Sequence, residues 1–325
     1  MGNGKEAVAL GAAALENIAS VLDVAATEVR DVWPLKQGLT NDSWHFATPS
    51  GEYVYRAPGI GTEDLIDREA EVAALRVARD LGLDGTFVYE DAQAGWKVSR
   101  FISNARTLNA HDGTQVARAM RMARTLHTSN AQVGRGFDFY LEGKRYEGLL
   151  REVANPSRIP GYAELSVKAA RVAAFARADR APVCLTHNDF FELNILIDED
   201  DRMHLIDWEY AGMSDYAHDF GTFCVCCRLT EAEADAALRA YFGRTPTERE
   251  RCHNFAYMAL AGWCWYVWSL YKAACGGDVV EWRETYLSYA ERYLDPVIAG
   301  YEALAQRGVS ECGSVPNNAC EEAIA

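Results

Sequence analysis

The segment from Leu185 to Phe220 constrains this chain more than any other stretch. It continues from an apolar lead-in to His187-Asn188-Asp189, and it places Asn194 five residues after Asp189. Two short runs of alternating apolar and polar residues follow, Ile195–Asp198 and Met203–Asp207, with an acidic turn between them. Alternation with a period of two around a polar turn is typical of a β-hairpin. The sequence therefore predicts a hairpin with polar side chains where the chain enters it and where it ends.

Asp189 and Asn194 fall on the loop that enters this hairpin, and Asp207 falls at its end. This placement suits phosphoryl transfer, in which one carboxylate orients a hydroxyl nucleophile and accepts its proton. An amide and a second carboxylate, here Asn194 and Asp207, would hold the Mg²⁺ that bridges the nucleotide phosphates. The competing interpretation is an ordinary hairpin whose acidic residues are solvated.

The tripeptide Asp219-Phe220-Gly221 has the spelling of the metal-binding signature of protein kinases. Asp207 is separated from Asn194 by the length of one hairpin, whereas this tripeptide lies farther along the chain by about the length of a helix. We therefore assign the metal to Asp207. Asp219 is predicted instead to accept backbone hydrogen bonds that brace the catalytic loop.

The pattern HND-x4-N, followed by LIDWEYAG and then DF, resembles the choline/ethanolamine kinase family of the aminoglycoside phosphotransferase and protein-kinase-like superfamily. The bacterial lic-type choline kinases are the most similar branch, and the resemblance extends from Pro34 to Leu294. It implies an α+β, protein-kinase-like bilobal fold, with a five-stranded antiparallel sheet and one helix in the N-lobe and a mostly helical C-lobe. It also implies ATP and Mg²⁺ as cofactors, Glu209 as an additional outer metal contact, and choline as the acceptor.

Alternating runs before residue 102 indicate a sheet, and a periodic apolar pattern among them indicates a helix. The predicted strands are Val32–Leu35, Ser43–Ala47, Glu52–Ala57, Thr86–Glu90 and Trp96–Phe101; the helix is Asp64–Leu81, after a first helix at Glu6–Leu22. Helical patterns dominate later, and Phe137–Val153 has no clear assignment. We expect an N-lobe at residues 1–102, a C-lobe at 103–306 and a disordered tail at 307–325.

A short turn between the first two strands contains Gly38, Leu39, Thr40 and Asn41. Its small and amide residues can place backbone N–H groups near phosphates. Taken alone it is an ordinary turn, and no Walker motif of the GxxxxGKS type is present. The choline kinases have a similar GLTN-type turn, so the resemblance implies a loop that covers the nucleotide. The segment that begins with Phe101 and Ile102 is then the hinge whose backbone meets the adenine ring.

Arg56 occupies the strand position where protein kinases have a phosphate-binding lysine. The choline kinases resemble this chain in using arginine there, and a guanidinium can bind phosphate oxygens in a bidentate fork. The segment Asp67–Glu71 resembles the DRxxE motif of the family, so Glu71 is the expected ion-pair partner of Arg56, with Glu69 as the fallback. Without the resemblance, these residues would be a surface arginine and solvated glutamates.

Two aromatic pairs with helical spacing lie near the C-terminus: Trp265 with Trp268, and Tyr286 with Tyr289. Such stripes usually pack in a core. Here they resemble the choline kinase pattern LWxLWS followed by YxxYA, whose aromatic residues surround an ammonium group. A trimethylammonium group cannot donate hydrogen bonds, so aromatic faces suit it. The four residues are therefore predicted to bind the acceptor.

Other acceptor substrates, and a function other than that of an enzyme, are also compatible with the sequence. An ethanolamine, aminoglycoside or sugar kinase would share the same catalytic residues, but polycationic aminoglycosides favour a wider groove rich in carboxylates. The segment Phe223–Cys226 lacks the carboxylate that some relatives have after the DFG-like tripeptide. A nucleotide-binding pseudokinase is suggested by Arg56 and the glycine-poor loop, whereas the set of Asp189, Asn194 and Asp207 argues against it.

The composition of the chain limits the classes of molecule that it is expected to bind. The formal net charge of −15 disfavours nucleic acid and anionic membrane surfaces, and it suits a small cationic alcohol. Nine scattered cysteines without a compact framework are typical of reduced thiols and a cytoplasmic location. No uninterrupted apolar run approaches the length of a membrane span. The protein is expected to be a monomer or a homodimer.

Overall fold

The structure, a computed structural model, describes residues 10–35, 41–59 and 67–312. The chain forms two compact units. The first comprises residues up to 138, 182–219 and 229–241, and the second comprises 139–181, 220–228 and 242 onward. This division differs from the predicted boundary at residue 102, because the catalytic loop and its hairpin group with the N-terminal sheet.

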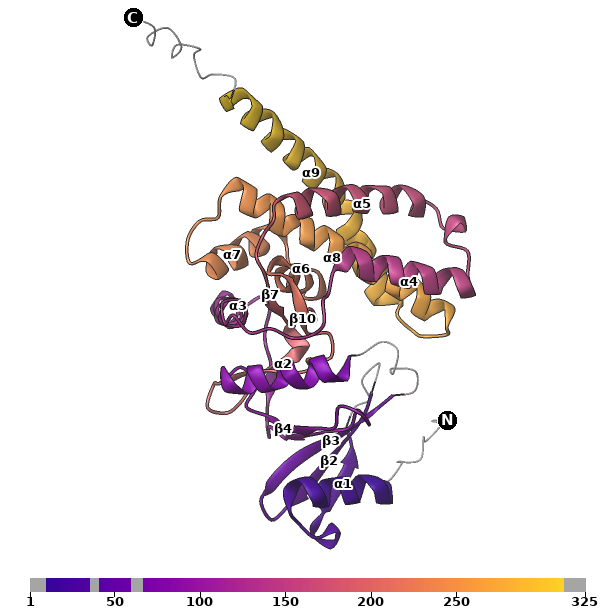
Figure 1. The fold of residues 1–325 in the computed structure, drawn as a ribbon, viewed down its shortest axis with the longest axis vertical. Helices are drawn as coiled ribbons and strands as arrows, with labels where there is room; N and C mark the ends of the chain where they lie inside the picture. The colour runs from indigo at the N-terminus through magenta and orange to yellow at the C-terminus, as the bar shows by residue number, and fades with distance from the viewer. Residues whose placement is uncertain (1–9, 36–40, 60–66, 313–325) are drawn as a thin grey trace, which may run out of the picture. The chain divides into compact units, whose positions relative to one another are not determined.

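The first unit contains an antiparallel sheet with the strand order β1-β2-β3-β5-β4 (Figure 1). Its strands are β1 (Arg30–Pro34), β2 (Asn41–Thr48), β3 (Gly51–Pro58), β4 (Phe87–Glu90) and β5 (Lys97–Arg100). Helix α1 (Ala12–Leu22) precedes the strands, and α2 (Arg68–Asp80) follows β3 in the sequence. The predicted five-stranded antiparallel sheet and the α+β class are confirmed.

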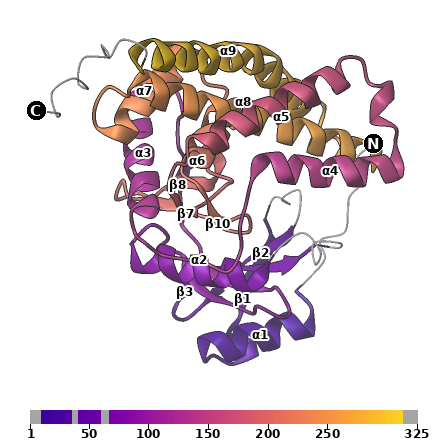
Figure 2. The same cartoon turned by 45° about the horizontal axis from the view of Figure 1, so that its top comes forward.

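The two faces of this sheet have different chemistry because successive side chains point to opposite faces. One face packs against Ile18 of α1 in a buried core, which contains Phe46, Tyr53, Tyr55 and Val98. The other face is more polar, since Arg56 of β3 lies directly opposite Lys97 of β5 in the register. Figures 1 and 2 show α1 and α2 on opposite faces of the sheet. The polar face is therefore the one that α2 covers.

The segment that the sequence predicts to be catalytic contains short strands of the first unit. The predicted hairpin is confirmed as β8 (Ile195–Ile197) and β9 (Met203–Leu205), and β8 also pairs with β6 (Arg106–Thr107). Strand β7 (Val183–Thr186) leads into the catalytic loop and pairs with β10 (Gly212–Asp215). The first unit also contains the helices α3 (Gly113–His127) and α7 (Glu231–Phe242), whereas α6 (Ala217–Cys226) begins in the first unit and continues in the second.

The second unit is helical, with α4 (Phe139–Val153), α5 (Tyr162–Ala178), α8 (Glu248–Ala274) and α9 (Val280–Cys312). Helix α8 contacts the other three, and the segment that the sequence left unassigned is α4. Helix α9 extends to Cys312, and residues 313–325 of the predicted disordered tail lie outside the described part, so this tail stays a prediction. Among the described residues, no helix has both the length and the apolar character that crossing a bilayer requires.

Close packing of α8 on α9 leaves no room for a side chain at Gly262. A Cβ atom there would lie 2.9 Å from the backbone nitrogen of Ala290 and 3.0 Å from the carbonyl oxygen of Tyr286. Gly148 of α4 is a matched contrast, because a Cβ atom there would meet nothing within 4 Å. Tyr286 therefore sits at a point where two helix backbones approach closely.

Gly262→Ala is expected to lower the melting temperature, because overpacking costs about 1–3 kcal/mol. Gly148→Ala should leave the melting temperature unchanged or raise it, because alanine has the higher helix propensity by about 1 kcal/mol. Thermal unfolding of the two variants beside the wild type checks this. Equal melting temperatures for both variants would contradict the close approach of α8 and α9.

A buried charge cluster joins α2 to the polar face of the sheet. Glu71 of α2 accepts hydrogen bonds from Lys97 Nζ at 3.1 Å and from Arg68 at 2.9 Å. Glu90 of β4 lies opposite Lys97 in the register, and its carboxylate is 4.0 Å from the ammonium nitrogen of Lys97. The Glu90 side chain is as buried as that of Glu71. Burial raises the pKa of Glu90 to about 8, with Lys97 opposing the rise and the Glu71 charge adding to it. Glu90 is therefore mostly protonated at neutral pH.

Glu90→Gln tests this protonation through stability. The ordinary pKa of 4.5 applies to the unfolded chain, so between about pH 4.5 and 8 the folded protein holds one proton more, and its stability falls as pH rises. The amide cannot titrate, so the variant should gain melting temperature relative to the wild type from pH 5 to pH 8.5. Thermal unfolding at pH 5, 7 and 8.5 measures the difference. A constant difference across this range would show that Glu90 keeps an ordinary pKa.

Candidate active site

Asp219 fixes the shape of the catalytic loop. Its buried carboxylate accepts the backbone N–H of His187 at 3.0 Å and that of Asn188 at 2.6 Å. The predicted bracing role of Asp219 is thereby confirmed. Nε2 of His127 lies 2.9 Å from the same carboxylate, while Nδ1 of His127 lies 2.9 Å from the hydroxyl of Tyr241. His127 is thus a hydrogen-bonded residue at the end of α3.

Asp189 and Asn194 meet within the loop. The Asn194 amide donates to the Asp189 carboxylate at 2.8 Å and to the Asp189 backbone carbonyl at 2.9 Å. The backbone N–H of Ile206 donates to the carbonyl of Asn194 at 2.9 Å, which ties the loop to the end of the hairpin. Asp207 follows directly, so backbone geometry brings the three predicted residues into one site.

Arg56 bridges the two carboxylates that follow the hairpin. Its guanidinium donates to Asp207 at 2.5 Å and to Glu209. The backbone of Asp207 is left-handed, with φ 69°. Aspartate and asparagine are among the few residues that adopt this conformation readily. The three side chains therefore form a compact ion-pair group beside the loop.

The predicted ion pair between Arg56 and Glu71 is wrong. Glu71 instead uses its two oxygens for Lys97 and Arg68, while the Arg56 fork faces Asp207 and Glu209. The strand register explains why Glu71 pairs with Lys97 instead of Arg56, because Lys97 lies directly across from Arg56 on the same face of the sheet. Sequence reasoning missed Lys97, although Lys97 and Ser99 alternate with Trp96 and Val98, a signal that they share one face.

The pKa values of the acidic residues in this site are driven apart. Burial raises the pKa of Asp189 to about 8, and repulsion from Asp207 and Glu209 adds to the rise. Burial would also raise the pKa of Asp207, but the charges of Arg56 and Lys97 and the hydrogen bond from Arg56 together outweigh it and hold that pKa below its ordinary value. A base works best when its pKa lies near the operating pH, so Asp189 is suited to accept a proton and Asp207 to remain an anion.

The donor set fits a magnesium ion that is also bound by phosphates. No cluster of three His, Cys, Asp or Glu side chains with the arrangement of a metal site occurs within residues 10–35, 41–59 and 67–312. Mg²⁺ usually takes only one or two carboxylates from the protein and the rest of its ligands from phosphate and water. Asp207 and Glu209 already bind a cation, the Arg56 guanidinium, so these carboxylates attract positive charge.

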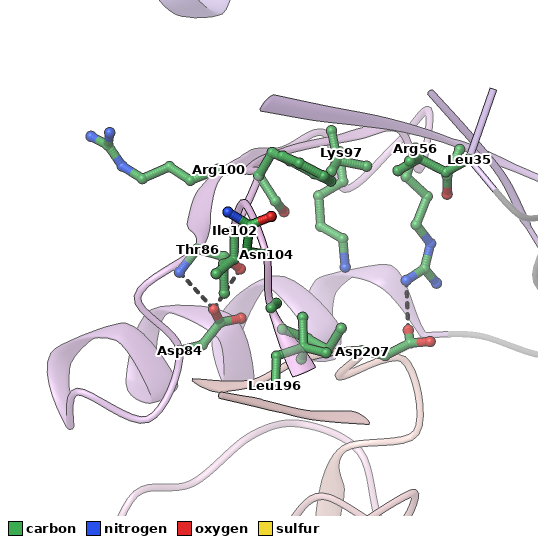
Figure 3. Close-up of a pocket in the computed structure, with 16 residues that line it drawn as sticks. Leu35, Arg56, Asp84, Thr86, Lys97, Arg100, Ile102, Asn104, Leu196 and Asp207 are labelled. Atoms are coloured by element: carbon green, nitrogen blue, oxygen red, sulfur yellow. Dashed lines mark hydrogen bonds and ion pairs between the residues drawn. The ribbon is translucent and has the colours of Figure 1, made fainter. Parts of the chain in front are cut away.

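A cavity of about 470 Å³ opens on the polar face of the sheet (Figure 3). Part of its lining is apolar and suits a flat ring, namely Leu35, Val54, Phe101, Ile102, Leu196 and Ile206. Arg56, Lys97 and Asp207 supply charged groups. The predicted hinge residues Phe101 and Ile102 therefore lie in the cavity wall. The predicted covering loop, Gly38–Thr40, lies outside the described residues, and Asn41 begins β2.

The four predicted acceptor residues lie on two helices of the second unit. The rings of Trp265 and Trp268 on α8 meet edge to face with centroids 6.2 Å apart, Trp265 being buried and Trp268 half-buried. On α9, Tyr286 stacks on Trp282, and Tyr289 packs against Tyr293. Their role in acceptor binding stays a prediction.

The sequence and the fold of this chain are similar to those of known proteins. Residues 31–254 match the phosphotransferase enzyme family, APH. Protein LicA of Haemophilus influenzae is 26% identical over 294 residues, which cover 82% of this chain and 79% of LicA. The crystal structure of choline kinase LicA from Streptococcus pneumoniae has a TM-score of 0.72 and 27% identity, covering 89% of this chain and 97% of that one.

A structure of LicA in complex with AMP is similar as well. Its TM-score is 0.69 at 25% identity, and the match covers 88% of this chain and 96% of that one. The predicted protein-kinase-like fold and superfamily are thereby confirmed. With a match that spans more than half of its length, the chain belongs to the phosphotransferase enzyme family.

Proposed function

We propose that this protein is an ATP-dependent kinase that phosphorylates the hydroxyl group of choline or of a closely related amino alcohol. The observation that supports this most directly is the convergence of Asp189, Asn194 and Asp207 in the unit that contains the cavity. A proton acceptor, an amide and a second carboxylate are the groups that phosphoryl transfer requires. The similarity to choline kinase LicA supports choline as the acceptor.

The nucleotide would occupy the cavity, with its adenine ring between the apolar walls and its hinge contacts at Phe101 and Ile102. Arg56 would bind the phosphates. Asn194 and Asp207, with Glu209 outside them, would hold Mg²⁺, whose charge offsets that of the phosphates. Arg56 and Mg²⁺ thus share the same carboxylates in this proposal.

Asp189 would act on the acceptor hydroxyl. Its carboxylate accepts the hydroxyl proton while the oxygen attacks the γ-phosphorus, and the bond between that phosphorus and the bridging oxygen of ADP breaks. The hydrogen bond from Asn194 holds the carboxylate in place. The pKa of Asp189 is raised to about 8 in the metal-free protein. The positive charge of Mg²⁺ bound nearby would favour its anionic form, which takes up the hydroxyl proton and later releases it to solvent.

Trp265, Trp268, Tyr286 and Tyr289 would surround the quaternary ammonium of choline. Desolvated contacts between a cation and an aromatic face contribute on the order of 2 kcal/mol each. Ethanolamine has a primary ammonium that needs hydrogen-bond acceptors, and Phe223–Cys226 supplies no carboxylate for it. The aromatic composition therefore favours choline over ethanolamine and over polycationic aminoglycosides.

An assay of ADP release with choline, ethanolamine, an aminoglycoside and a sugar tests the function and the acceptor together. Choline should give the highest kcat/KM, and tetramethylammonium should compete with choline, because only an aromatic cage binds it. Trp268→Leu should weaken both choline use and this competition, whereas Trp268→Phe retains an aromatic face. ADP release with none of the alcohols would favour the pseudokinase, and indifference to tetramethylammonium would eliminate the cage.

Asp189→Asn should reduce kcat by about 10²–10⁴-fold, the usual contribution of a general base. Its affinity for ATP should stay within about twofold of the wild type, because the amide keeps the shape of the side chain. Asp200→Asn, in the exposed turn of the same hairpin, is the control and should keep full turnover. Steady-state kinetics and a nucleotide titration give both quantities. Normal turnover in Asp189→Asn would remove the base from the proposal.

A further inference from the structure

We infer that Lys97 is a second phosphate-binding cation of the nucleotide cavity, and that Glu71 is the residue that positions it. The inference rests on the proposed binding of a nucleotide in this cavity. It assigns to a lysine on β5 the place that protein kinases give to a lysine on β3, which pairs with a glutamate on the helix above the sheet. Here that helix is α2, and its glutamate binds Lys97.

The geometry points the Lys97 ammonium into the cavity. Lys97 lies opposite Arg56 in the register, and both side chains line the cavity. In Figure 3 the two side chains extend from the sheet toward the level of Asp207. Lys97 is thus close enough to act on the same phosphate chain.

Lys97 also has hydrogen-bonding capacity to spare. An ammonium group has three donors. Among the described residues only Glu71 lies within hydrogen-bond distance of Lys97 Nζ, since Glu90 is 4.0 Å away. The Lys97 side chain is only 9% exposed, and it lines the cavity. Its remaining donors therefore face the cavity rather than open solvent. Phosphate oxygens would satisfy these donors.

The charges of the two cations are balanced differently. Arg56 faces two carboxylates, Asp207 and Glu209, and it is committed to both. Lys97 shares its single carboxylate, Glu71, with Arg68. Glu90, which could have been a second partner, is kept mostly neutral because burial raises its pKa. Lys97 is therefore the less neutralised of the two cations before a nucleotide binds.

The test is the affinity of ADP relative to adenosine, measured by titration calorimetry in EDTA so that no metal contributes. Lys97→Met should weaken ADP binding about tenfold or more, the usual effect of losing a charge-assisted hydrogen bond, and should leave adenosine binding unchanged. Lys97→Arg should recover most of the loss. Arg79→Met removes a positive charge from an exposed position on α2 and should leave both affinities unchanged.

Glu71→Gln separates positioning from folding. It keeps the ammonium but removes the anion that orients it, so the ratio of ADP to adenosine affinity should fall by less than in Lys97→Met. A purely structural role of Glu71 would change both affinities alike. If Lys97→Met leaves an unpaired charge that prevents folding, the double variant Lys97→Met/Glu71→Gln removes both charges and permits the same titration.

The outcomes distinguish this inference from the proposed function. A wild-type protein that binds no ADP would refute nucleotide binding itself. If the wild type binds ADP, the inference is overturned when Lys97→Met keeps the wild-type ratio of ADP to adenosine affinity. It is also overturned when adenosine binding falls as far as ADP binding. A fall confined to ADP supports it.

Discussion

The buried carboxylate of Asp219 is the interaction on which the catalytic loop depends. It binds two consecutive backbone N–H groups, those of His187 and Asn188, and Asn188 has a left-handed backbone with φ 64°. An unpaired buried N–H costs about as much free energy as a lost hydrogen bond, so this turn forms only where such an acceptor exists. The direction in which Asp189 leaves the loop follows from that turn. Asp219 therefore shapes the loop through its backbone.

Much of the local structure could be predicted because its signals are local. The alternation in Ile195–Asp198 and Met203–Asp207 predicts β8 and β9, and the alternation before residue 102 predicts the sheet. The strands that were missed, β6, β7 and β10, pair with partners distant in the sequence: β6 with β8, and β7 with β10. No local turn signal therefore marks them. Helix α9 runs through Pro296 because its neighbours Leu294, Val297 and Ile298 are buried, and packing outweighs the lost hydrogen bond.

The partners of charged side chains were harder to predict than their positions. Whether Glu71 binds Arg56 or Lys97 depends on the register between β3 and β5 and on the rotation of α2, which no short motif encodes. Desolvation then decides which groups stay charged. Asp189 and Glu90 have raised pKa values because each is buried near another carboxylate, whereas Asp207 is held as an anion by Arg56. The arrangement of opposite charges, rather than the residue type, sets the protonation state.

The left-handed backbone of Asp207 has a consequence for how substitutions there are interpreted. Most side chains would add conformational strain at this φ, so a loss of function in them would mix two causes. Asparagine tolerates the same conformation and has nearly the same size as aspartate. Among the possible replacements, asparagine therefore isolates the contribution of the negative charge, while alanine or leucine would report on the backbone as well.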